Sequence, residues 1–252
     1  MMSTRRTLAV ACAAALMAVP ALAEDLTITF KTTGSSGAGT STSYYSSEKM
    51  RTGHGDSETI VEYATGKITS IDHKKKEYSE ITLAEMEQAN AQMKQQMASM
   101  PPAVREKMEQ MMGGAAGAVT VTKGGSRQVA GYTCQDYTVA MGASTTTKVC
   151  ATTALKFPAP NVDYRKVASF AEMGGAMGNN AGMAKMAEEM KKIEGFTIAE
   201  STSLQMMGRS MDSSKEAVEI KKGPIPASSF DVATIAKGYK KIPHKHPVAQ
   251  MK

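Results

Sequence analysis

Methionine is the residue type whose abundance and spacing in this sequence could support chemistry. The chain has 252 residues and 21 methionines. Three methionines lie within the first 23 residues, so 18 remain in the rest of the chain, against only four leucines (Leu26, Leu83, Leu155 and Leu204). Many of these methionines recur at intervals of three, four or seven residues, which is the spacing of an apolar helix face. The sequence therefore predicts helices in which methionine replaces leucine.

A face of thioether side chains suits three different roles. Methionine fills irregular cores, forms adaptable apolar surfaces for lipids or flexible partners, and offers a soft sulfur that binds Cu(I). Pairs such as Met97-x-x-Met100 and Met183-x-x-Met186 have a spacing that suits a soft metal ion. Helical periodicity alone produces the same spacing, so these three interpretations stay open.

We expect the methionine faces to enclose an apolar ligand rather than a metal ion. No metal-ligand set and no cofactor is predicted. The residues predicted to line the ligand cavity come from helical stretches before and after residues 132–152: Met86, Met93, Met97, Met100, Phe170, Met186 and Met190.

The other chemically capable residues form no catalytic constellation. His54 and His73 fall in turns and are expected to be solvated, and His244 and His246 belong to a basic tail. The Gly-x-Ser-x-Gly and His-Glu-x-x-His motifs are missing, and so is a phosphate-binding glycine loop of the usual spacing. The sequence therefore predicts a protein without enzymatic activity.

The first 23 residues have the three parts of a secretory signal peptide. Arg5 and Arg6 precede an apolar stretch over residues 7–19, and Ala21 and Ala23 form an Ala-x-Ala end. Cleavage near Ala23 predicts a periplasmic or secreted protein of 229 residues with a formal charge of +4, because two arginines and no acids are removed. That charge is small and scattered, and aromatic residues are only 5% of the chain, so nucleic-acid binding is not expected.

Two cysteines, Cys134 and Cys150, remain after the signal peptide, which carries Cys12. Residues 132–141 and 145–152 read as strands around a turn at 142–144, and the midpoint between the two cysteines is residue 142. They should therefore face each other across a hairpin. In an exported chain this predicts a structural disulfide, worth about 3 kcal/mol for a loop of this size.

The elements that position these residues follow from the periodicity of the sequence. Residues 25–33 alternate between apolar and polar side chains, as in a strand with one buried face. Thr82 and Glu85 form a capping box that begins a helix. Further strands are predicted at 41–51, 57–64, 67–72, 76–81, 118–123, 127–130, 196–206 and 217–222, further helices at 102–112, 161–173 and 183–193, and a closing loop at 223–242.

These elements predict a single α+β domain over residues 24–242, followed by a loose tail at 243–252. Short strands at regular spacing favour an antiparallel sheet that curls. The predicted fold is a curved antiparallel half-open β-barrel, with Met-rich helices covering its concave face.

Several short stretches resemble a known family. They are residues 44–51, Lys76-Glu77-Tyr78, residues 129–137, residues 225–232 and residues 238–241. Through them the chain resembles the domain-of-unknown-function family 4412 of exported bacterial proteins. More distantly, it is similar to the lipoprotein carrier and receptor fold of the Gram-negative envelope. The resemblance implies a half-open barrel closed by helices, with a cavity for acyl chains.

The sequence therefore predicts an exported, non-enzymatic binding protein that holds an acyl chain or another apolar ligand under Met-rich helices. Its expected partners are a lipid or other apolar small molecule and, peripherally, components of the envelope. Two alternatives stay open: a periplasmic Met-rich buffer or chaperone for Cu(I) or Ag(I), and a structural envelope protein without a small ligand.

Overall fold

The structure of the protein is a computed structural model. It describes residues 24–34, 37–101, 119–142, 144–162, 188–206 and 209–244. The predicted signal peptide at 1–23, most of the tail at 243–252 and the helix predicted at 102–112 lie outside these residues. So do residues 163–173 and 183–187 of the helices predicted at 161–173 and 183–193.

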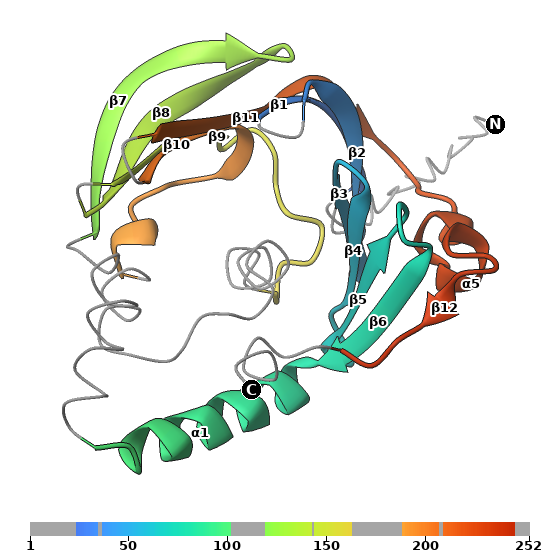
Figure 1. The fold of residues 1–252 in the computed structure, drawn as a ribbon. Coiled ribbons are helices and arrows are strands. Elements are labelled where there is room, and N and C mark those ends of the chain that lie inside the picture. The colour runs from blue at the N-terminus through green and yellow to red at the C-terminus, as the bar shows by residue number, and fades with distance from the viewer. Residues whose placement is uncertain are drawn as a thin grey trace, which may run out of the picture.

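The described residues form one twelve-stranded sheet that does not close (Figure 1). Its order is β12-β6-β5-β4-β3-β2-β1-β11-β10-β9-β8-β7. Neighbouring strands are antiparallel, apart from the parallel pair β12–β6. The strands are β1 Leu26–Thr33, β2 Gly39–Tyr45, β3 Lys49–His54, β4 Ser57–Glu62, β5 Lys67–Asp72, β6 Glu77–Thr82, β7 Val119–Val129, β8 Tyr132–Met141, β9 Thr145–Thr152, β10 Phe196–Met206, β11 Arg209–Lys222 and β12 Lys240–Lys241.

The sheet bends into an arch with β1 near its centre (Figure 1). The alternation predicted for the first strand is confirmed, because Leu26, Ile28 and Phe30 are each no more than 3% exposed while the side chains between them are only half-buried. These three residues belong to the main apolar core on the concave side of the arch. A curved, open, antiparallel sheet is therefore the architecture, as the spacing of short strands predicts.

The helix α1 (Leu83–Ala98) begins directly after β6, where the capping box was predicted. The Glu85 carboxylate accepts a hydrogen bond from the Thr82 backbone N–H at 2.7 Å, and the Glu85 N–H donates to Thr82 Oγ1 at 3.2 Å. Met86, in the first turn, is buried in the main core. From there α1 extends below the open side of the arch (Figure 1).

The centre of the concave face is covered by an irregular segment after β9, over residues 153–162. Leu155, Pro158 and Ala159 are buried, and Phe157 packs against the main core. In Figure 1 this segment descends from β9 into the arch. The prediction that methionine-rich helices cover the concave face is therefore not confirmed: of the described helical residues, α1 contributes Met86 of its first turn to the main core, and the middle of that face is filled by a loop.

Several predicted segments differ from the structure. The strand expected at 217–222 begins already at Arg209, as β11. The strand expected over residues 41–51 is two strands, β2 and β3, because Ser46 Oγ accepts a hydrogen bond from the Lys49 N–H at 3.0 Å and closes a turn. The strands expected at 118–123 and 127–130 are the single strand β7, with an irregular register between Lys123 and Ser126. The Gln135 amide stabilises that irregularity by donating to two β7 carbonyls at 2.7 Å.

The segment expected to be a closing loop is ordered. It contains the 3-10 helix η1 (Ala227–Phe230), the short helix α5 (Val232–Ile235) and β12. α5 lies on the outer side of the arch (Figure 1), where Ala236 packs in an apolar cluster with Ile60 and Ile71. The C-terminal part of the domain therefore buries apolar side chains on the convex face, which short-range sequence patterns do not reveal.

Candidate functional site

Four aromatic side chains meet on the concave face. Phe157 stacks on Phe196 with ring centroids 6.5 Å apart, and Tyr45 meets Phe196 edge-to-face at 5.1 Å. Tyr63, directly after β4, completes the group with its ring centroid 5.7 Å from that of Phe157. We call these residues the aromatic cluster. It joins β2, β4, β10 and the segment after β9, so it holds the two arms of the arch together.

Three hydroxyl groups on this face are buried without a hydrogen-bond partner among the described residues: those of Ser41, Ser43 and Tyr63. The two serines lie on β2, opposite Phe30 and Ile28 of β1. Burial raises the pKa of Tyr63 well above its usual range, and nearby Tyr45 and Asp25 add to that rise. A buried tyrosine hydroxyl normally finds a partner, so this face carries unused polar capacity within apolar surroundings.

The predicted methionine site is only partly described. Met86 packs in the main core together with Leu83 and Tyr63. Met190 is half-buried in a different apolar cluster, with Val119 and Tyr137, so the structure does not bring these two methionines together.

The remaining predicted site residues are placed as follows. Met93 and Met97 lie on α1, but their side chains are not among those described, and Met100 is half-buried just beyond the helix. Phe170 and Met186 lie outside the described residues. The cavity-lining role of the set stays a prediction.

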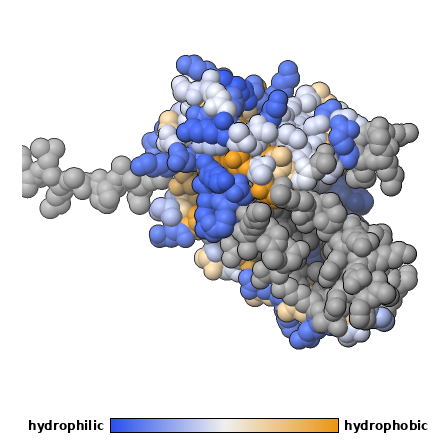
Figure 2. All heavy atoms as spheres, turned by 90° about the vertical axis from the view of Figure 1, so that its left-hand side faces the viewer, coloured by the Kyte–Doolittle hydropathy of each residue, from blue (hydrophilic) through white to orange (hydrophobic). Residues whose placement is uncertain are grey.

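Hydrophobic residues are visible on the side of the molecule seen in Figure 2. They gather at mid-height, beneath the layer that carries β7 and β8 and above the part of the molecule that carries α1. In this view the apolar interior of the arch reaches the surface between the sheet and the helix.

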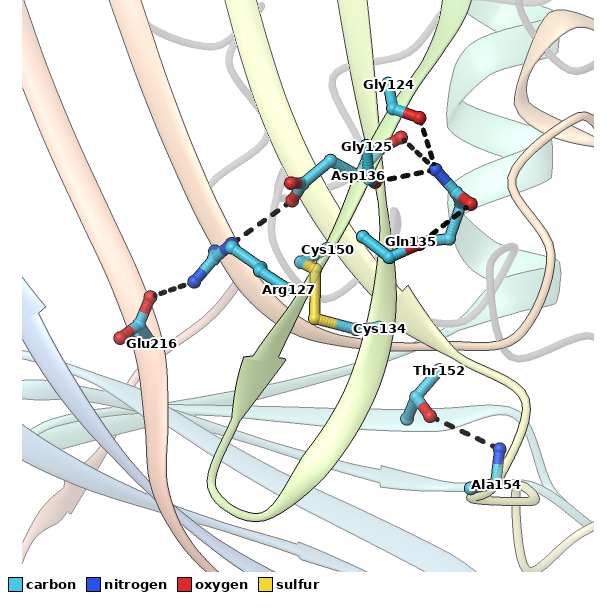
Figure 3. Close-up of a disulfide and its surroundings, with 11 residues drawn as sticks. Gly124, Gly125, Arg127, Cys134, Gln135, Asp136, Cys150, Thr152, Ala154 and Glu216 are labelled. Atoms are coloured by element: carbon cyan, nitrogen blue, oxygen red, sulfur yellow. Dashed lines mark hydrogen bonds and ion pairs between the residues drawn. A yellow bond between two sulfur atoms is a disulfide. The ribbon is translucent and has the colours of Figure 1, made fainter.

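The predicted disulfide joins Cys134 of β8 to Cys150 of β9, with Cα atoms 5.4 Å apart (Figure 3). The expectation that the two cysteines stand directly opposite each other is wrong by two residues, because Cys150 pairs with Asp136 in the register. The bond is therefore diagonal across the hairpin, a spacing that side chains in a twisted ladder can span.

His73 is not the solvated turn residue that the sequence suggested. Its Nε2 lies 3.1 Å from a carboxylate oxygen of Glu58, and its Nδ1 lies 2.9 Å from the hydroxyl of Tyr239. Arg51 completes this polar network, since it donates to both Glu58 oxygens and, at 3.0 Å, to the carbonyl of Ser229. The network fastens the C-terminal segment to the outer face of β3 and β4.

The described residues contain no group of three or more His, Cys, Asp or Glu side chains arranged to hold a metal ion. Within the same part of the chain, no helix has both the length and the apolarity needed to cross a membrane.

Known structures resemble this chain only distantly. PNGF-II has 11% identity and a TM-score of 0.43 over 90% of this chain, which spans 32% of that protein. An uncharacterized conserved protein from Thermus thermophilus has 7% identity and a TM-score of 0.43, with 88% of this chain and 91% of that protein covered. MucB of Pseudomonas aeruginosa, in complex with MucA(peri), has 10% identity and a TM-score of 0.35, and this chain covers 53% of it with 82% of its own length.

The family of the chain is assigned from its sequence. No curated protein matches the chain. A family pattern matches residues 25–234, which include every strand from β1 to β11. The chain therefore belongs to the family described as Domain of unknown function (DUF4412).

Proposed function

We propose that the protein is an exported, non-enzymatic binding protein that holds an acyl chain or a similar apolar ligand on the concave face of its sheet. The ligand lies between the aromatic cluster and the first turn of α1, where Tyr63, Leu83 and Met86 share one apolar core. The methionines of α1 beyond Met86 provide the adaptable surface that closes over it.

The observation that carries this proposal is the unused hydroxyl of Tyr63. Binding sites for small apolar molecules are lined mainly by apolar and aromatic side chains, with a few polar groups that orient the ligand. Tyr63 is such a group, because its hydroxyl is buried beside Phe157 without a partner among the described residues. A fatty-acid carboxyl group would satisfy it.

Native mass spectrometry of protein purified from the envelope tests the proposal, together with titration of a fluorescent fatty acid. We expect a co-purifying lipid or saturable uptake of the probe. Tyr63→Phe keeps the ring and removes the hydroxyl, so it should weaken binding of the fatty acid about tenfold or more, as expected for loss of a hydrogen bond to a charged group.

Tyr137→Phe is the matched control, because Tyr137 is a buried tyrosine in a different apolar cluster. Its binding of the fatty acid should equal that of the unmodified protein. A preparation that carries no lipid and takes up no probe would contradict the proposal, and equal affinity of the Tyr63→Phe variant would remove Tyr63 from it.

A further inference from the structure

The arm of the sheet from β11 to β7 curls so far that its last strand returns to its first. Three strands separate β7 from β11 in the sheet order, yet Arg127 of β7 lies 2.7 Å from the carboxylate of Glu216 on β11. Arg127 also pairs with Asp136 of β8 at 3.2 Å (Figure 3). This curl encloses a groove of about 610 Å³, lined by residues of β1 and of β7–β11.

On β1, the lysine that lines the groove lies on the face opposite to the apolar side chains of that strand. Phe30 points to the concave core, so the neighbouring Lys31 points to the other face. The register places one continuous row of polar side chains across this face, because residues that pair directly in a ladder share a face. From β1 to β8 the row is Thr33, Ser214, Ser201, Lys148 and Thr138.

The carboxylates of Asp136 and Glu216, which lie on this face, already form ion pairs with Arg127. Glu200 also borders the groove. In the strand register it lies opposite Lys215 of β11 and Val149 of β9, and the side chains of this adjacent row point to the opposite face of the sheet.

Two lysines of the groove, Lys31 and Lys148, have no carboxylate oxygen within 4.0 Å among the described residues. Their strands, β1 and β9, are three places apart in the sheet. Measured along the sheet at about 4.8 Å per strand, the path between their backbones is about 14 Å. An elongated ligand can follow this path and contact both ammonium groups.

We propose that this groove is a second binding site, for an elongated ligand that carries at least two oxyanion groups such as phosphates, sulfates or carboxylates. Lys31 and Lys148 each bind one anionic group, and the row of serine and threonine hydroxyls between them donates hydrogen bonds to the intervening oxygens. The site is independent of the apolar ligand proposed for the concave face.

Isothermal titration at low salt with orthophosphate, linear tripolyphosphate and a longer linear polyphosphate tests the spacing. Affinity should rise with chain length until the ligand reaches both lysines. Lys31→Gln and Lys148→Gln should each weaken binding of the longest chain about two- to fivefold, as expected for exposed ion pairs, and the double variant about tenfold. Lys74→Gln/Lys76→Gln, at the turn between β5 and β6, is the matched control and should bind unchanged.

Protection of Lys31 and Lys148 from acetylation by bound polyphosphate, read by mass spectrometry of the unmodified protein, gives a result that does not depend on how the variants fold. The proposal is overturned if neither lysine is protected, if the groove and control variants lose affinity equally, or if orthophosphate binds as tightly as the longest chain.

Discussion

Replacing Tyr63 by phenylalanine is expected to stabilise the protein in the absence of ligand. The Tyr63 hydroxyl is buried in the main core and has no hydrogen-bond partner among the described residues. Leaving such a group unsatisfied costs about 1–3 kcal/mol, because its hydrogen bonds to water are lost on folding and are not replaced. Tyr63→Phe removes that cost while keeping the ring contact with Phe157, so the free energy of unfolding should rise by about 1–3 kcal/mol.

For a domain of this size that gain raises the melting temperature by roughly 2–12 °C. Chemical and thermal unfolding of delipidated protein measures it. Tyr137→Phe is the control with the opposite sign, because the Tyr137 hydroxyl accepts a hydrogen bond from the Glu194 N–H at 3.2 Å, and its loss should cost about 0.5–1.5 kcal/mol. If Tyr63→Phe is destabilising, the hydroxyl has a partner in the folded protein and the reasoning behind the ligand site is wrong.

The same residue predicts a dependence on alkaline pH. Burial raises the pKa of Tyr63 above the ordinary value of 10.0, so the folded protein keeps a proton that the unfolded chain releases. This contribution to stability is complete below pH 10.0 and decreases by about 1.4 kcal/mol per pH unit above it. Unfolding measured across that range should show a steeper loss for the unmodified protein than for the Tyr63→Phe variant, and parallel curves would count against the burial of this hydroxyl.

Three further substitutions test the fold. Gly195→Ala should lower the free energy of unfolding by about 3 kcal/mol or more, because Gly195 has a φ of +93° and an added Cβ would lie 2.4 Å from a backbone carbonyl oxygen. Gly131→Ala is the control: with φ +82° and open space around it, it should cost only about 1–2 kcal/mol. Equal losses of stability in the two variants would refute the clash. Replacing Cys134 and Cys150 by alanine should lower the free energy of unfolding by about 3 kcal/mol, and an unchanged denaturation midpoint would contradict this. Arg51→Met should cost about 1–3 kcal/mol and expose residues 227–241 to proteolysis, whereas unaltered protease resistance would show that the polar network does not fasten that segment.

Local signals in the sequence predicted the elements that depend on neighbours in the chain. The alternation of Leu26, Ile28 and Phe30 identified β1, and Thr82 and Glu85 marked the start of α1. The hairpin of β8 and β9 and its disulfide were also predictable, because the turn, the strand pattern and the two cysteines lie within a short stretch. In each case the interactions that decide the structure connect residues close in sequence.

The candidate site was much less predictable. The helical spacing of methionines predicts an apolar helix face but does not say which surface that face covers. Tyr63 and Phe157 carry no local motif, and their contact depends on the bend of the whole sheet. His73 likewise gains its partner Tyr239 only because the C-terminal segment returns to β6. The strand register was also not predicted. Both strands of the hairpin were correct, but in the structure Cys150 lies opposite Asp136 and not opposite Cys134.

The position of β1 has a consequence for how the protein folds. β1 pairs with β2 on one side and with β11 on the other, so Leu26, near the start of the domain, pairs with Lys222, near its end. Until β11 is available, the meander from β1 to β6 has an open edge on its first strand, the kind of edge that recruits other chains. Closing so long a loop is entropically costly and slow. The nascent or unfolded chain is therefore the state in which this protein is most exposed to aggregation, and shielding of its first strand should determine how much of it reaches the native fold.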